Sequence, residues 1–158
     1  MGRKKTQRKR SVVKGALAGL AGGIAGAGAK LVVEAILPPG VPGEIPAPVA
    51  LVEKAAGHPL KGTEREAARQ AVHWVFGALA GAAYGAAVEL LPEASTWRGA
   101  AFGLALNRFT HSRLLPRMGL EAPVGEQSTQ KKQSEWVTHA AYGLVTEAVR
   151  RGVRRGLE

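Results

Sequence analysis

The sequence contains no cysteine and no aspartate, and all 12 of its acidic residues are glutamates. The absence of cysteine excludes a disulfide framework, thiolate zinc sites, iron–sulfur clusters and a cysteine nucleophile. Aromatic residues make up only 5% of the 158 residues, whereas glycine contributes 21. A large aromatic-rich soluble core is therefore not expected, and the length leaves room for one domain.

Motifs for catalysis are also missing from the sequence. There is no GxSxG, no phosphate loop, and no GxGxxG placed between a strand and a helix. The five serines have no evident histidine or carboxylate companion: Ser11, Ser95, Ser112, Ser128 and Ser134. We therefore predict a protein without enzymatic activity, without a cofactor and without a bound metal.

Apolar residues gather in four segments, at about 12–37, 71–91, 97–115 and 136–152. A helix that spans a bilayer needs about 20 mostly apolar residues. The second segment meets this requirement most clearly, whereas the first carries Lys30 and Glu34 and the last two are shorter and more polar. No segment shows the wide polar face of a soluble amphipathic helix. We predict an all-α polytopic membrane protein, a four-helix transmembrane bundle.

The remaining residues divide into a tail and two longer loops. Residues 1–11 form a basic tail, and a membrane domain follows over 12–155, with proline-containing loops at 38–70 and 116–135. A basic start before an apolar run also resembles a signal peptide, but the run is too long for a typical signal core and no small-residue cleavage site follows.

The net charge is +10, because 22 basic residues outnumber 12 acidic ones. Basic residues are concentrated near both termini. Because positively charged flanks stay in the cytoplasm, both termini are predicted there, with four spans and the loops 38–70 and 116–135 outside. The expected location is a bacterial inner membrane, where the basic tails would meet anionic lipid headgroups. The basic block at 3–10 contains no aromatic residue to stack on bases, so no specific nucleic acid is expected as a partner.

The chain contains a weak internal duplication. Lys14-Gly15 with Gly19 matches Arg98-Gly99 with Gly103. Further along, Tyr84-Gly85 followed by Glu89 matches Tyr142-Gly143 followed by Glu147. The sequence therefore predicts two Gly/Ala-rich helical hairpins, at about 12–92 and 97–155.

Glycines at intervals of four form stripes on the predicted helices. In lipid, such stripes let helix backbones approach closely. We expect them to pack helices within one chain, and the alternative is a homo-oligomer interface or pore. The residues are Gly15, Gly19, Gly23, Gly77, Gly81, Gly85, Gly99 and Gly103.

Ionisable residues within the spans fall into two layers. Near the cytoplasmic end we predict two ion pairs that lock the hairpins, Lys14 with Glu89 and Arg98 with Glu147. Such groups are costly in a membrane unless they are paired or reach its surface.

The outer layer is predicted to hold a polar cluster. One hypothesis is a proton-responsive site, because histidine titrates near neutral pH. The alternative is hydrogen bonding between helices. A metal site of three histidines and Glu34 would suit the ligand types, but it lacks a close motif spacing. The cluster consists of Lys30, Glu34, His73, Asn107, His111 and His139.

Several of these features together resemble the YagU-like inner-membrane proteins of bacteria, over about residues 12–152. The most specific stretch runs from Ala29-Lys30 through Glu34 to Pro38-Pro39, and His73-Trp74 and Tyr84-Gly85 fit the second span of that family. The family is largely uncharacterised and has a link to acid resistance. The resemblance implies no catalytic or ligand residues.

We therefore predict a small non-enzymatic inner-membrane protein that supports acid or envelope-stress tolerance. One alternative is a small oligomeric transporter or proton-conducting channel. Another is a soluble helical protein that binds nucleic acid through its basic tails.

Overall fold

The computed structural model describes residues 10–40 and 43–157, and over these residues the chain is helical without any strand. The basic block at 3–9 lies outside the described residues. A 3₁₀ segment, η1 (Pro92–Gly99), precedes α4, and a π-helical turn, η2 (Thr110–Leu114), follows it. The α-helices are α1 (Val12–Ile36), α2 (Ala47–Ala56), α3 (Gly62–Leu90), α4 (Ala100–Phe109), α5 (Leu115–Arg117) and α6 (Thr129–Gly156).

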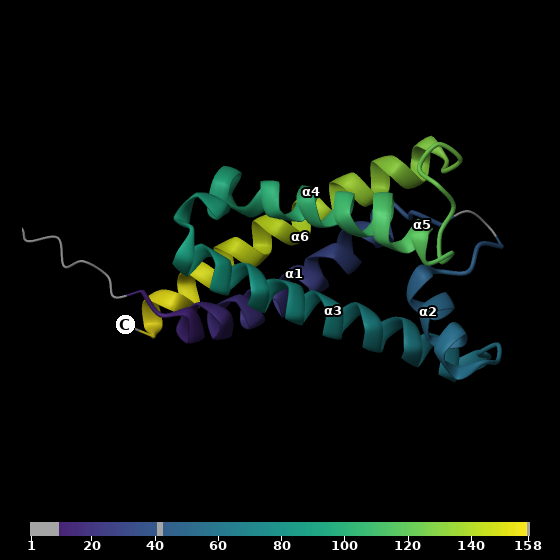
Figure 1. Cartoon of the computed structure of the whole chain (residues 1–158), viewed down its shortest axis with the longest axis horizontal. Coiled ribbons are helices and arrows are strands. Elements are labelled where there is room, and N and C mark those ends of the chain that lie inside the picture. Colours follow the sequence, from purple (N-terminus) through teal and green to yellow (C-terminus); the bar gives the residue numbers. More distant parts are fainter. Residues whose placement is uncertain (1–9, 41–42, 158) are drawn as a thin grey trace, which may run out of the picture.

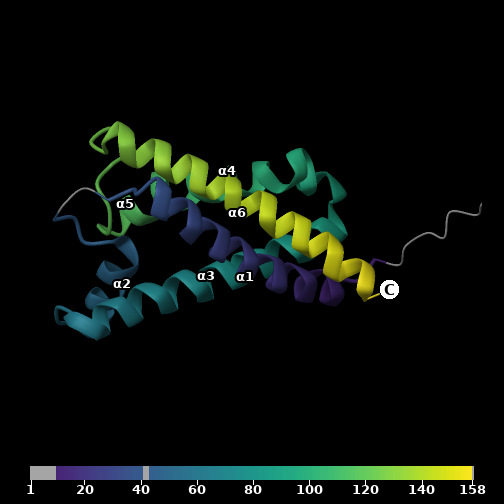
Figure 2. The ribbon, with the colours of Figure 1, turned by 180° about the vertical axis from the view of Figure 1, so that it is seen from behind.

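Helix α1 lies at the centre of the bundle, where it packs against both α3 and α6, and α4 packs on α6 (Figure 1). The helices converge at the end where α1 begins and α6 finishes. At the other end α3 and α6 diverge, and α2 lies beside the start of α3. The view from behind shows the same divergence (Figure 2). The two described ends of the chain meet, since Lys14 Nζ donates a hydrogen bond to the carbonyl oxygen of Leu157.

Glycines set the distance between α1 and α3. A Cβ atom added at Gly19 would overlap the carbonyl oxygen of Gly81 and lie 2.8 Å from Cα of Gly85. The reverse substitution is equally blocked, because a Cβ at Gly85 would lie 2.7 Å from Cα of Gly19. Gly23 faces Gly77 in the same way. The two backbones are therefore in direct contact, as the spacing of four predicts for close helix packing.

A second face of α1 contacts α6. A Cβ at Gly22 would overlap the carbonyl oxygen of Thr146, and one at Gly26 would lie 2.8 Å from the carbonyl oxygen of Tyr142. Helix α1 therefore uses glycines on both faces for contacts inside one chain. These contacts favour helix packing within one chain over a homo-oligomer interface or pore as the use of the glycine stripes.

The two hairpins repeat one contact. A Cβ at Gly15 would lie 2.5 Å from the carbonyl oxygen of Gly85 and would overlap the Glu89 side chain. Gly99 stands in the same relation to α6: its added Cβ would overlap the carbonyl oxygen of Gly143 and lie 2.5 Å from Cβ of Glu147. These are equivalent positions of the two segments that match in sequence.

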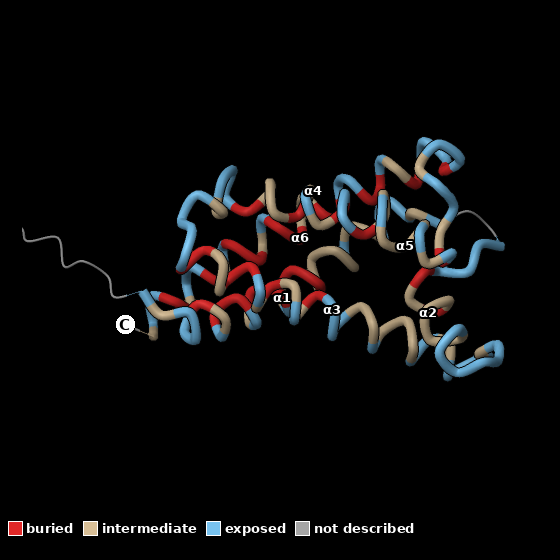
Figure 3. The backbone as a smooth tube through the Cα atoms, viewed as in Figure 1, coloured by how far each residue is buried: buried red, intermediate tan, exposed pale blue. Residues whose placement is uncertain are grey.

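Polar residues fill the interior and apolar residues cover the outside. Among the described residues, 13 polar or charged residues are buried against eight apolar ones, while 20 large apolar side chains are exposed. The buried residues concentrate where the helices converge (Figure 3). Most of the polar ones come from one face of α6. This distribution is the reverse of that in a soluble domain.

The helix boundaries differ from the predicted spans in the second hairpin. The segment 97–115 does not form one α-helix: its first residues belong to η1, and α4 passes into the π turn after ten residues. Helix α6 begins at Thr129, inside the stretch that the sequence assigned to a loop. The prediction of an all-helical fold is confirmed. Two of its helices, α1 and α3, are long and apolar enough to cross a membrane.

Candidate functional site

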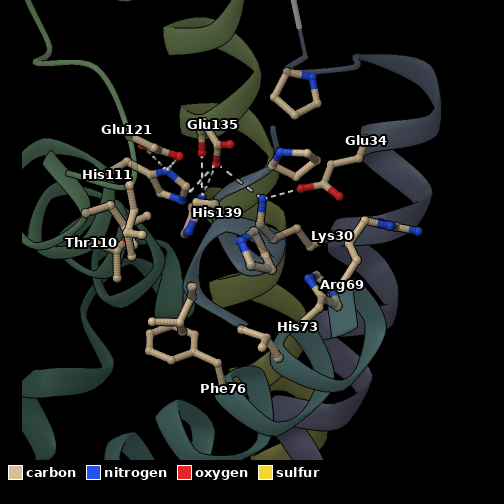
Figure 4. Close-up of a pocket in the computed structure, with 18 of the residues that line it drawn as sticks. Lys30, Glu34, Arg69, His73, Phe76, Thr110, His111, Glu121, Glu135 and His139 are labelled. Atoms are coloured by element: carbon tan, nitrogen blue, oxygen red, sulfur yellow. Dashed lines mark hydrogen bonds and ion pairs between the residues drawn. The ribbon is translucent and has the colours of Figure 1, made fainter. Parts of the chain in front are cut away.

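A cavity of about 840 Å³ opens where the helices diverge. Its walls come from α1, α2, α3, α6 and the stretch from α4 to α5 (Figure 4). One part of the wall is apolar and includes Leu31, Val72, Phe76, Leu106, Leu115 and Tyr142. The opposite part is ionisable and includes Lys30, Glu34, His111, Glu121, Lys131, Glu135 and His139.

Glu135 is the centre of the ionisable part. Its Oε2 atom lies 3.3 Å from each of three nitrogen atoms: Nζ of Lys30, Nε2 of His111 and Nδ1 of His139. Glu135 and His139 are buried, whereas His111 is partly exposed to the cavity. One buried carboxylate therefore connects α1, η2 and α6.

Lys30 connects this centre to the rest of α1. Its ammonium pairs with Glu34 one turn further along the helix and donates to Oγ1 of Thr138 at 3.1 Å. The pairing along α1 is the one that the i, i+4 spacing allows. Lys30 therefore has two carboxylate partners, one on its own helix and one on α6.

The π turn positions His111. A π-helical turn widens the backbone by one residue and is frequent at functional sites. His111 is the second residue of η2, and its Nδ1 donates to both carboxylate oxygens of Glu121, at 2.9 and 3.0 Å. Its Nε2 lies 3.3 Å from Oε2 of Glu135, so the ring stands between two carboxylates.

His139 is held from within α6 and from α4. Its Nδ1 donates to the backbone carbonyl oxygen of Glu135 at 2.8 Å, and the side-chain amide of Asn107 lies 3.5 Å from the same atom. The rings of His111 and His139 meet edge to face, with centroids 5.1 Å apart. One side-chain atom from each of His111, Glu135 and His139 lies within 4.8 Å of the other two.

The structure brings together most of the predicted outer residues and leaves one apart. Lys30, Glu34, His111 and His139 share the ionisable wall, with Asn107 behind His139. His73 also lines the cavity, but its Nε2 donates to the carbonyl oxygen of Ala27 at 3.0 Å, away from the group around Glu135. Sequence reasoning missed Glu121, Glu135 and Thr138. The spacing of Glu135 and His139, four residues apart on one helix, was the available signal.

At the opposite end of the bundle both predicted glutamates have arginine partners. Glu89 pairs with Arg154 (Oε1 to Nε, 2.7 Å) and accepts a hydrogen bond from the backbone nitrogen of Ser11 at 2.9 Å. Glu147 pairs with Arg150 at 2.6 Å and with Arg151, and it accepts from the Tyr84 hydroxyl group at 2.9 Å.

The predicted cations of this layer lie elsewhere. Lys14 is directed to the carbonyl oxygen of Leu157, and Arg98 is exposed in η1 with a φ of 55°. The predicted pairs of Lys14 with Glu89 and of Arg98 with Glu147 are therefore replaced by pairs with arginines of α6. The cause is α6, which runs beyond the predicted span and places a face of arginines against α3.

Comparison with known proteins gives one finding. A family model described as a protein of unknown function (DUF1440) matches residues 24–148. No curated protein and no solved structure matches the chain. The match includes the cavity and the residues of the first span on which the resemblance was based. The chain therefore belongs to the DUF1440 family of proteins of unknown function, the YagU-like family.

Proposed function

We propose that the chain is an integral membrane protein without enzymatic activity, in which α1, α3, α6 and the stretch from α4 to α5 cross the bilayer. The observation that carries this proposal is the apolar outer surface around a polar interior. In water, a monomer rarely exposes a contiguous apolar patch of more than a few hundred Å². The exposed residues on α1 and α3 include Val13, Leu17, Ile24, Val32, Val75 and Leu79.

The polar composition of α6 does not oppose a membrane location. Its buried charged residues face the other helices, where Glu147 meets Arg150 and Tyr84. Its exposed residues include Trp136, Val137 and Leu144, together with Arg151 and Arg155 near its C-terminal end. Ionisable residues are tolerated in a membrane when they face the bundle interior and are paired. The same argument applies to Asn107 of α4, which is buried, but not to Arg108, which is exposed on that helix.

The orientation follows from charge. The two described ends of the chain lie together. The C-terminal end carries several arginines, and the sequence before Ser11 is basic. The positive-inside rule supports a cytoplasmic location for both ends, close to anionic lipid headgroups. The bacterial inner membrane is the location that this orientation and the family resemblance support.

Extraction of membranes tests the location. The protein should stay in the pellet after washes with high salt and with alkaline carbonate, and detergent should release it. A soluble protein that binds nucleic acid through its basic tails would leave the membrane fraction in high salt, because phosphate contacts weaken steeply with salt. Release by salt alone would refute the proposal.

The cavity supports a second candidate function, binding or transport of a small amphipathic molecule. Ligand sites in proteins have volumes of about 300–1,000 Å³ and combine apolar walls with a few convergent polar groups. The cavity has both features, with Phe76 and Leu106 on one side and the cluster around Glu135 on the other. Leu106→Trp should fill the apolar part and should abolish binding of an environment-sensitive fluorescent amphiphile. Unchanged binding would refute the assignment to this cavity.

The physiological part of the proposal is a role in acid or envelope-stress tolerance, which the resemblance supports. A strain without the protein should survive low pH or envelope stress less well, and the intact chain should restore survival. Proton flux in proteoliposomes separates this role from that of a proton-conducting channel, since a channel would raise the flux above that of empty vesicles. Equal survival with and without the protein would remove the stress role.

A further inference from the structure

We propose that His111, Glu135 and His139 bind a divalent first-row transition metal ion at the wall of the cavity. Two imidazoles and one carboxylate form a donor set that suits Zn²⁺ or Fe²⁺. This inference goes beyond the membrane location and does not depend on it, because the three residues and their contacts lie within the chain itself.

The distances match those of a metal site. Ligands at about 2.0–2.1 Å from a tetrahedral metal ion stand about 3.3–3.4 Å from one another. Oε2 of Glu135 lies 3.3 Å from Nε2 of His111, so this ligand–ligand distance is that of a bound ion. One ligand atom of each of the three residues lies within 4.8 Å of the other two. Nδ1 of His139 also lies 3.3 Å from Oε2 of Glu135, and to bind the ion it would have to give up its proton and its hydrogen bond to the carbonyl oxygen of Glu135.

The hydrogen bond of His111 to Glu121 provides a second, independent observation. Its Nδ1 donates to Glu121, which orients the ring so that Nε2 faces Oε2 of Glu135. A carboxylate on the far nitrogen is also the usual support of a metal-binding histidine, because it fixes the ring and raises its basicity.

The cavity gives an ion access to these atoms. His111 is partly exposed to the cavity, and Glu121, Glu135 and His139 also line it. The cavity side leaves room for a fourth ligand, a water molecule or a polar group of a bound molecule. Structural sites usually have four protein ligands, whereas sites with three keep an open position.

Lys30 competes with a metal ion for the carboxylate of Glu135. Its ammonium lies 3.3 Å from the Glu135 oxygen that a metal ion would use, and Glu34 offers that ammonium a second partner. A divalent ion would be repelled by Lys30. Removing the Lys30 charge should therefore strengthen metal binding, whereas removing any one of the three ligands should weaken it.

Calorimetric titration tests the site. The full-length protein, purified without a histidine tag and freed of metal by a chelator, is titrated with ZnCl₂ and with MgCl₂. One Zn²⁺ should bind per chain, and Mg²⁺ should not compete, because it prefers oxygen ligands. His111→Gln should weaken Zn²⁺ binding by about tenfold or more, and Glu121→Gln, which removes the supporting carboxylate, should also weaken it by about tenfold. Lys30→Met should tighten it.

Two controls separate metal binding from loss of the fold. His73→Gln, in the same cavity but outside the cluster, should leave the Zn²⁺ affinity unchanged. Zn²⁺ should raise the thermal midpoint of the intact chain but not that of His111→Gln, whose helical circular dichroism should be intact. No Zn²⁺ binding by the intact chain, equal binding by His111→Gln, or weaker binding by Lys30→Met would each overturn the proposal.

Discussion

Glu89 and Arg154 lie 65 residues apart in the sequence and meet in the interior through two hydrogen bonds, 2.7 Å between Oε1 and Nε and 3.2 Å between Oε2 and Nη2. The same carboxylate accepts from the backbone of Ser11. It therefore joins the end of α3, the start of α1 and the last turns of α6. Together with Glu147, which pairs with Arg150 and Arg151, this carboxylate supplies the buried ion pairs of the convergent end.

Replacing this carboxylate should be costly. Glu89→Gln removes the carboxylate charge that faces the buried Arg154 guanidinium, and we expect a loss of about 3 kcal/mol in the free energy of unfolding. The measurement is denaturation of the purified protein in detergent. A double-mutant cycle with Arg154→Gln should show a coupling of about 1 kcal/mol or more, while the cycle with Lys14→Gln should be additive. If Glu89 coupled energetically to Lys14 and not to Arg154, the ion pair of Lys14 with Glu89 that the sequence predicted would be correct.

Close contact of α1 and α3 makes Gly19 intolerant of any side chain. Gly19→Ala should destabilise the protein by about 2 kcal/mol, because the new methyl group overlaps the backbone of α3. Gly28→Ala is the matched control on the same helix. Its Cβ would lie 3.6 Å from the Trp74 ring, an ordinary contact, and alanine is the better helix former by about 1 kcal/mol. Equal thermal midpoints for the two variants would contradict the packing.

Arg98 should be replaceable by glycine without loss. Its φ of 55° is in the left-handed region, where a side chain costs about 1 kcal/mol and glycine does not. We expect Arg98→Gly to raise stability by about that amount. Arg108→Gly, at an exposed position of α4, should instead lower it by about 1 kcal/mol. A large loss for Arg98→Gly would indicate that Arg98 forms an ion pair after all.

Reporter fusions test the orientation. A reporter that is active only outside the cytoplasm should be silent at the C-terminus and active when inserted at Gly57, between α2 and α3. The expectation follows from the basic residues at both ends and from the two ends lying together. Activity at the C-terminus and silence at Gly57 would invert the topology, and activity at both points would exclude an even number of crossings.

Local sequence patterns were sufficient to predict the helix ends and the packing face of the first hairpin. Pro38 and Pro92 predicted where α1 and α3 finish, and the structure ends them at Ile36 and Leu90. The spacing of Gly15, Gly19 and Gly23 identified a small-residue face. These features depend on one helix at a time, which is why a single sequence contains them.

The contacts of the second hairpin depend on a register that the sequence does not display. The π turn rotates His111 relative to α4, and an extra residue in a turn has no compositional signature. Glu135 was assigned to a loop because the apolar run begins only at Trp136. Helix α6 starts earlier because Ser128 caps it, accepting a hydrogen bond from the backbone nitrogen of Lys131. The longer helix brings Glu135 next to Lys30 and Arg154 next to Glu89, two contacts that the predicted span did not include.

The polar face of α6 has a consequence for the order in which the chain assembles in a bilayer. A helix that buries Glu135, Glu147 and Arg154 gains little from hydrocarbon on its own. Helices α1 and α3 supply partners for two of these charges, Lys30 for Glu135 and Glu89 for Arg154. Helix α1 also contacts α6 closely through Gly22 and Gly26. Because the chain is synthesised from its N-terminus, α1 and α3 enter the membrane before α6. Helix α6 therefore inserts against a pair of helices that has already formed. A chain that lost the α1–α3 contact would leave α6 outside the membrane.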